Sequence, residues 1–334
     1  MSGTFLGYPF DEELFLMQWQ AAQDPVKLAM LNSGAIQSNS TIKNLISNGS
    51  NVYTIPFYDV LGGEPDNYDG QTDITTTEPT GSSQSGVVYG RAHGWKDRDF
   101  IHDFNSGADP MKQITSQVAR FWDKKRQGTV LKILDGVFGT TDDVGGYLSK
   151  WQKHTVDVSK TGEGMLTETT MGDAAQAAVG DNADIFSLIW MHSKPAQNLA
   201  NLQLLTFRKY TDANGIERQL KIADYNGKTV IVDDDCPYDA ASGLYTTYAL
   251  GMGAIHYADA PVKTPVEMVR EAKAQGGFDE VITRLRETYH PNGFSYQLPV
   301  GCISPTNAQL GAAANWKIAV DPKLIPLVKI VSKG

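Results

Sequence analysis

The sequence predicts a mixed α+β fold with one long helix and one long two-stranded extension. Three observations lead to this prediction. A helical apolar pattern of unusual length follows Asp109, and strand-like and helix-like segments alternate through the second half of the chain. In addition, residues 62–85, which lie between two strand-like segments, are almost entirely Gly, Pro, Ser, Thr and other polar types. At 334 residues the chain can form two compact units or one core with long extensions.

Composition and charge exclude several classes of function. Hydrophobic residues make up 41% and charged residues 20%, which is typical of a folded protein. The net charge of −9 gives no overall field that would draw the protein onto nucleic acid. No apolar stretch approaches the ~20 residues that cross a bilayer. Asp11, Glu12 and Glu13 stand where a secretory signal would be most apolar, so no export is expected.

The N-terminal third predicts an arm followed by a hairpin. The first ~50 residues alternate short helical patterns with polar joints and are too poor in apolar residues for a core of their own, so they should pack on another part. Residues 52–58 read as a strand, and a second strand is expected near 86–90. The segment 62–85 between them has only Tyr68 and Ile74 as large apolar residues and cannot order itself by burial. We therefore expect a long hairpin that stands away from its domain.

A long helix is expected next, with Asp109 as its N-cap and Pro110 at its first position. Its apolar residues recur at three- and four-residue spacing: Met111, Ile114, Val118, Phe121 and Trp122, then Val130, Leu131, Leu134 and Val137. At ~1.5 Å per residue such a helix could extend ~40 Å. The Gly- and Thr-rich segment 140–170 reads as a junction of loops and short strands.

The second half predicts an α/β or α+β unit. Helices are expected at 173–179 and at 193–205, the latter capped by Ser193. Strands are expected at 184–191, 228–233, 245–257, 281–289, 293–299 and 325–331. Gly251 and Gly253 interrupt one of these strands, and we interpret them as points where another backbone approaches closely.

No motif nominates a catalytic, cofactor-binding or metal-binding residue. Gly227-Lys228-Thr229 imitates a phosphate-binding loop, but Ile222 stands where that loop needs glycine, so a hairpin turn at Asn226-Gly227 is favoured. The acidic run 233–235 is interpreted as a solvated turn rather than a cation site.

Histidine and cysteine spacing favours structural roles as well. None of the six histidines has the i, i+4 partner of a helical metal site, and no nucleophile elbow occurs. Cys236 and Cys302 form no CxxC motif and are expected to be free thiols in a reducing cytoplasm.

Four short segments in the second half carry a family resemblance. They are DIFSLIWMHS at 184–193, GKTVIVDDD at 227–235, YTTYALGMGAIHY at 245–257 and RETYHPNGFSY at 286–296. In this order, and following an arm, a long hairpin and a long helix, they resemble segments of the tailed-phage major capsid proteins with the Hong Kong 97-type fold. The resemblance extends over roughly 57–331.

The resemblance implies a domain plan and a function. The N-terminal arm and first strand would be 1–56, the extended loop 57–99, the spine helix and peripheral domain 100–172, the central part of the axial domain 173–286, and the returning strands 287–334. The protein would assemble into pentamers and hexamers of an icosahedral head that encloses double-stranded DNA without reading its sequence, and it would catalyse nothing. Assembly contacts are expected at the large side chains of the extended loop: Phe57, Tyr58, Tyr68, Ile74, Tyr89 and Trp95.

The resemblance also implies partners and a location. The partners would be other copies of the chain, a scaffolding protein, the portal, and decoration or cement proteins where the shell carries them. We expect a separate or processed scaffold, assembly in the host cytoplasm and a final place in the virion. No membrane or cofactor is implied.

One departure from the family concerns covalent cross-linking. Some relatives join subunits through an isopeptide bond from a lysine of the extended loop, but no lysine occurs between Lys43 and Lys96. We therefore expect a shell held by noncovalent contacts. Two alternatives stay open from sequence: an encapsulin-type compartment shell with the same fold, and a cytosolic α/β enzyme or binding protein.

Overall fold

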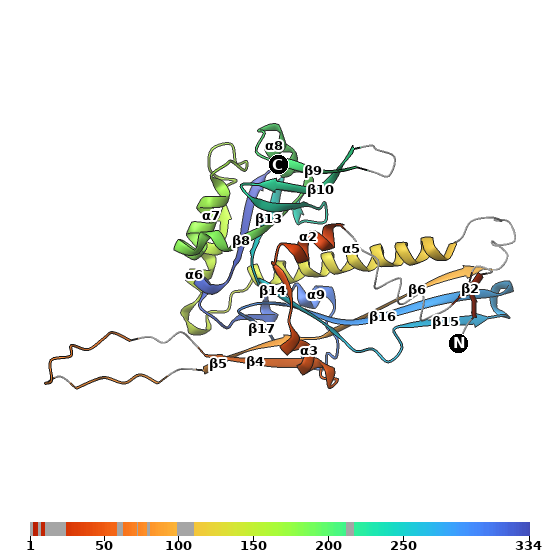
Figure 1. The fold of residues 1–334 in the computed structure, drawn as a ribbon, viewed down its shortest axis with the longest axis horizontal. Helices are drawn as coiled ribbons and strands as arrows, with labels where there is room; N and C mark the ends of the chain where they lie inside the picture. Colours follow the sequence, from red (N-terminus) through yellow and green to blue (C-terminus); the bar gives the residue numbers. More distant parts are fainter. Residues whose placement is uncertain are drawn as a thin grey trace.

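The structure is a computed structural model that describes residues 3–5, 8–10, 25–58, 63–71, 73–78, 81–98, 110–211 and 217–334. A long helix, α5 (Pro110–Phe138), runs through the middle of the molecule (Figure 1). One sheet with its helices stands above α5 in this view, a second sheet runs beneath it, and a hairpin projects to one side. No helix in the described part of the chain is long and apolar enough to cross a membrane.

The 29 residues of α5 correspond to ~43 Å of helix. It begins at Pro110 as predicted, whereas Asp109 and the side chains of Met111 and Ile114 lie outside the described residues. Its buried positions keep helical spacing, with Val118 and Trp122 near the start and Val130, Leu131, Ile133, Leu134 and Val137 further on. A Cβ on Gly136 would lie 2.6 Å from the carbonyl oxygen of Leu310, so glycine allows the neighbouring segment to approach.

The upper sheet has eight strands in the order β7-β19-β13-β8-β11-β10-β9, with β12 beside β13. Their bounds are β7 Thr155–Asp157, β8 Phe186–Met191, β9 Thr206–Thr211, β10 Glu217–Tyr225, β11 Lys228–Val232, β12 Tyr238–Asp239, β13 Leu244–Gly251 and β19 Leu327–Lys333. Successive residues of β8 point to opposite faces. Ile189 and Met191 pack with helices α7 (Thr170–Val179) and α8 (Ser193–Asn201), while Leu188 and Trp190 face the cluster that includes α5.

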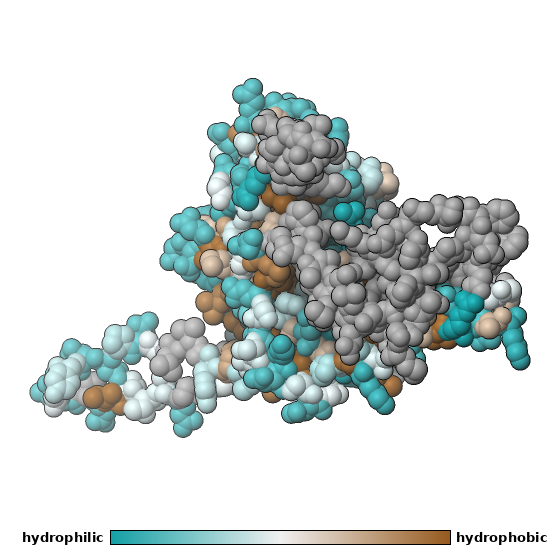
Figure 2. All heavy atoms as spheres, turned by 45° about the vertical axis from the view of Figure 1, so that its right-hand side comes forward, coloured by the Kyte–Doolittle hydropathy of each residue, from teal (hydrophilic) through white to brown (hydrophobic). Residues whose placement is uncertain are grey.

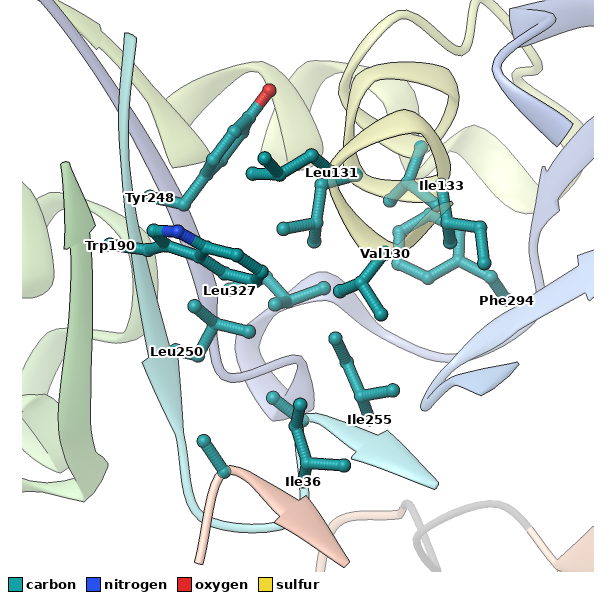
Figure 3. Close-up of a cluster of buried hydrophobic side chains, with 14 of the residues drawn as sticks. Ile36, Val130, Leu131, Ile133, Trp190, Tyr248, Leu250, Ile255, Phe294 and Leu327 are labelled. Carbon is teal, nitrogen blue, oxygen red and sulfur yellow. The ribbon is translucent and has the colours of Figure 1, made fainter. Parts of the chain in front are cut away.

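The main core lies between α5 and the upper sheet. Figure 3 shows Trp190, Tyr248, Leu250 and Leu327 of the sheet directed toward Val130, Leu131 and Ile133 of α5. Ile36, Ile255 and Phe294, from three other segments, close the same cluster. Helix α5 therefore packs against both sheets and connects them through this core.

The lower sheet has five strands in the order β15-β16-β14-β3, with β6 along the other edge of β16. Their bounds are β3 Ile36–Ser38, β6 Tyr89–Arg98, β14 Ile255–Ala260, β15 Val266–Glu271 and β16 Phe278–Pro291. The N-terminal segment joins this sheet, because β3 pairs in parallel with β14. Helix α3 (Ser40–Ser47) buries Ile42 and Ile46 against it, while α2 (Pro25–Asn32) lies close to α5 (Figure 1). The arm was expected to pack on another part. Its segments β3 and α3 pack on the lower sheet of the same subunit.

Shorter elements complete the fold. They are the hairpin β1 (Gly3–Phe5) and β2 (Tyr8–Phe10), the hairpin β4 (Val52–Tyr58) and β5 (Gly81–Val87), the pair β17 (Phe294–Tyr296) and β18 (Trp316–Ile318), helices α6 (Leu148–Trp151) and α9 (Asn307–Leu310), and 3-10 turns at Val144–Gly146, Gln152–His154, Gly180–Ile185, Ala274–Gly276, Ala313–Asn315 and Pro322–Leu324.

Several sequence predictions need correction. The segment 245–257 is not one strand but β13 and β14, which belong to different sheets and meet at a turn where Gly253 has a φ of 67°. The predicted close approach occurs at Gly251, where a Cβ would lie 2.6 Å from the Cβ of Pro326. Helix α8 is capped by the ring of His192, which accepts from the Lys194 amide, and not by Ser193.

Two boundaries also move. The second strand of the hairpin begins at Gly81, earlier than predicted, and β6 then pairs with β16 instead of extending the hairpin. Residues 255–286, which lie in the segment 173–286 that the resemblance relates to the central part of the axial domain, contribute β14 and β15 and most of β16 to the lower sheet. Strand propensity indicates that a segment is extended, but it does not indicate which sheet the segment joins.

Candidate assembly surfaces

The β4–β5 hairpin projects from the body of the subunit (Figure 1). Its strands pair from Val52 with Val87 to Tyr58 with Gly81. Beyond them the described residues of the tip, 63–71 and 73–78, form neither helix nor strand. The two arms of the tip are joined where the Asp66 carboxylate accepts bonds of 2.5 Å from both the amide and the hydroxyl of Thr75. These hydrogen bonds stabilise the charged carboxylate and lower the pKa of Asp66.

Large side chains lie in solvent at the end of β4 and in the tip beyond it. Tyr58, Tyr68 and Ile74 are 81%, 92% and 72% exposed, and Phe57 is half-buried. Figure 2 shows a hydrophobic spot on this projection among mainly hydrophilic atoms. Covering an exposed aliphatic side chain such as Ile74 would contribute roughly 1.5–3 kcal/mol, so these side chains can add to the stability of a contact. The tip is therefore suited to contact another molecule.

The other two residues nominated from sequence pack against the body of the subunit, Tyr89 fully buried and Trp95 half-buried. Tyr89 is 1% exposed and belongs to the main core, so its side chain is not available to a neighbouring molecule. Trp95 is half-buried and packs edge-to-face against Phe121 of α5, with ring centroids 5.3 Å apart. Both lie on β6, where pairing with β16 turns them toward the interior. The nomination of Tyr89 is thus wrong, since a large side chain in a strand does not reveal which face it occupies.

The root of the hairpin is held by buried polar contacts. The side-chain oxygen of Gln84, which is 7% exposed, accepts from the Gly293 amide at 2.9 Å and lies 3.3 Å from Nε2 of His290. Its amide group donates to Asn292 at 3.4 Å. Burial and the nearby His256 lower the pKa of His290 to about 3, so the ring is neutral at ordinary pH. Sequence spacing gave no sign of this site, because its members are far apart along the chain.

A second set of contacts fixes the same root. The hydroxyl of Tyr53 donates to Thr288, and Thr288 donates to the carbonyl of Val87. A Cβ on Gly86 would overlap the ring of Tyr53, so only glycine fits opposite it. Residues from both hairpin strands are therefore attached to one end of β16, and the hairpin leaves the body in a defined direction.

Helix α5 is attached to the lower sheet by a mostly buried ion pair. Nε of Arg126 lies 2.7 Å from Glu287, and a second nitrogen of Arg126 lies 3.2 Å from Asp123. Burial is the largest single influence and opposes the charge of Arg126, but Glu287, Tyr289 and Asp259 together outweigh it and raise the pKa of the guanidinium. Removing Arg126 would leave Glu287 buried without its counterion, which is costly.

The sequence motifs to which no chemical role was assigned have structural roles. Asn226 and Gly227 both have positive φ, 49° and 74°, and form the turn between β10 and β11, as predicted. Cys236 and Cys302 are free thiols. Within the described ranges, no group of three or more His, Cys, Asp or Glu side chains could hold a metal ion.

Comparison with solved structures defines the class of protein. The chain matches the capsid of Ralstonia phage GP4 with a TM-score of 0.55 at 10% identity, covering 90% of this chain and 87% of that one. It matches the capsid asymmetric unit of cyanophage Pam1 with a TM-score of 0.53 at 13% identity, covering 89% and 88%. The fold is therefore the mixed α+β fold of phage capsid subunits.

Sequence comparison identifies the family. The model of the Gp13-like family, described as major capsid protein 13-like, matches residues 147–325, more than half of the 334 residues. The chain belongs to this family of major capsid proteins. A curated relative, the major capsid protein of Bacillus phage SPP1, is 27% identical over 307 residues and 90% of each chain is covered. The protein is thus a structural component of the virion capsid and not an enzyme.

Proposed function

We propose that this chain forms pentamers and hexamers that close into the icosahedral head of a tailed phage around double-stranded DNA. The observation that carries the proposal is the β4–β5 hairpin, which exposes Tyr58 at the end of β4 and Tyr68 and Ile74 in the tip, and whose tip has no core of its own. Ordering such a segment costs conformational entropy that contacts with another subunit can offset. In a closed shell the same contact recurs at every symmetry-related position, so a weak contact is multiplied.

Each proposed domain of the subunit corresponds to one of the two large sheets. The hairpin is the extended loop, with Phe57, Tyr58, Tyr68 and Ile74 as its assembly contacts, and α5 is the spine helix. The lower sheet with α5 forms the peripheral domain. The upper sheet with α7 and α8 forms the axial domain, which lies nearest the axis of each pentamer or hexamer. Because β19 lies inside the upper sheet, the C-terminal segment belongs to the axial part.

The proposed partners are other copies of the chain, a scaffolding protein, the portal, and decoration or cement proteins. The family membership supports self-assembly as the main interaction. The family is one of phage capsid proteins, which favours a DNA-filled head over a compartment shell with enzyme cargo.

A deletion of residues 64–78, replaced by a short Gly-Ser link, tests the proposal. The deletion must stop before Gln84, which is buried at the root. We expect the purified subunit to keep its thermal unfolding midpoint within a few degrees and to form no pentamers, hexamers or shells by light scattering and electron microscopy. Normal shells from the well-folded deletion variant would refute the proposed role of the hairpin.

A further inference from the structure

A notch of about 180 Å³ lies between α5 and β6. Its floor includes Trp122 and Thr129, and its rim carries Arg91, Lys125 and Asn307. The Trp122 indole of the floor donates to Thr283 at 3.0 Å, which joins α5 to the central strand β16 of the lower sheet. The notch is thus a preformed feature of the body of the subunit.

Two cations on the rim, Arg91 and Lys125, form no ion pair within the described part of the chain. Arg91 donates to the carbonyl of Pro305 at 2.9 Å and to the side-chain oxygen of Asn307 at 2.6 Å, both of which are neutral. Nζ of Lys125 lies 5.4 Å from the ring of Phe121, and no ion pair of Lys125 occurs among the described residues.

The other charged groups near the notch are one cation and two carboxylates. Arg126 is paired with Glu287 on the floor and with Asp123 on its own helix. Glu287 also faces Arg91 at longer range, but its hydrogen-bonded ion pair is with Arg126. Together with Arg91 and Lys125 this makes three cations against two carboxylates, so the notch keeps a net positive charge, which lies on its rim.

The hairpin tip has the opposite charge. Glu64, Asp66, Asp69, Asp73 and Glu78 are acidic, and no Lys or Arg occurs between Lys43 and Arg91. The whole chain carries a net charge of −9, so two copies repel each other at long range. Contact between copies consequently needs places where opposite charges meet, and the tip and the notch are such places.

We propose that the notch of one subunit receives the acidic hairpin tip of a neighbouring copy. The proposal rests on the proposed function, in which the hairpin reaches across to another subunit, and adds the surface that receives it. Arg91 and Lys125 attract the carboxylates of the tip. The exposed Ile303 lies two residues before Pro305, which binds Arg91, so an apolar side chain is available near the rim for Tyr68 or Ile74.

Charge reversal on either side tests the pairing. One variant carries Lys125→Glu in the notch, and a second carries Glu64→Lys, Asp73→Lys and Glu78→Lys in the tip, residues chosen because Asp66 holds the tip together. The third variant combines all four changes. Lys132→Glu is the matched control, since Lys132 is an exposed lysine on the same helix outside the notch.

Assembly is measured by sedimentation velocity and electron microscopy, and folding by thermal unfolding. We expect each single-side variant to raise the concentration needed for assembly at least tenfold. The combined variant should return to within about threefold of the parent, and Lys132→Glu should match the parent. Normal assembly of both single-side variants, or no recovery in the combined variant, would overturn the notch proposal. If the 64–78 deletion still abolished assembly in that case, the hairpin would act at another surface and the proposed function would stand.

Discussion

At its root the β4–β5 hairpin is tied to β16 by buried hydrogen bonds, whereas at its tip the large side chains lie in solvent. Gln84 is 7% exposed and contacts three residues of the body, while Tyr68 is 92% exposed. The same element is therefore anchored at one end and unsupported at the other. This difference indicates that contacts within the subunit fix the direction of the hairpin. The tip would be ordered by contact with a neighbouring subunit.

Acidification should have the largest effect on the root. The pKa of His290 is lowered to about 3 by burial, well below its ordinary value of about 6.5. The unfolded chain therefore binds a proton at higher pH than the folded chain, so the stability present above pH 6.5 is lost as the pH falls toward 3. We expect the unfolding midpoint to fall over this window. His290→Gln, which cannot titrate, should flatten the profile, and an unchanged profile would contradict the assignment.

Removing the Gln84 side chain should have an intermediate effect. In Gln84→Ala the Gly293 amide loses its buried acceptor, which costs about 1–3 kcal/mol of unfolding free energy. Ser83→Ala on the same strand is the matched control, because Ser83 is exposed, and should change stability by less than about 0.5 kcal/mol. Chemical denaturation of both variants measures the difference. Equal stabilities would show that the root does not depend on this contact.

Truncation at the tip should have the smallest effect on the subunit and a clear one on the shell. Tyr68→Ala and Ile74→Ala remove side chains that are 92% and 72% exposed, so the unfolding free energy should change by less than about 0.5 kcal/mol. Assembly should need a higher protein concentration, as measured by light scattering. If these variants lost subunit stability but assembled normally, the tip would serve the fold of the subunit and not its assembly, which would contradict the distinction between root and tip.

The sequence predicted the parts of the fold that depend on local signals. Helix α5 begins at Pro110 because a proline at the first helical position and regular apolar spacing act within a few residues. The turn at Asn226-Gly227 was predictable for the same reason, since both residues tolerate positive φ.

The parts that failed depend on tertiary contacts. The segment Gly81–Val87 contains GSSQS and has little intrinsic strand preference, yet it is a strand because β4 pairs with it and Gln84 is buried. Tyr89 was expected at an interface and lies in the core, because the face of a strand is decided by the sheet it joins. The network around His290 joins residues more than two hundred positions apart, which no local pattern can indicate.

Limited proteolysis of free subunits and of assembled shells tests the central claim most directly. If a neighbouring copy orders the hairpin tip, a protease that cleaves after acidic residues should cut within 63–78 in free subunits, because the described residues of the tip are exposed and form neither helix nor strand. Cleavage of the same bonds should be at least tenfold slower in shells than in free subunits. Exposed acidic residues elsewhere on the surface of the subunit serve as the reference. Equal cleavage of the tip in free subunits and in intact shells would contradict the account.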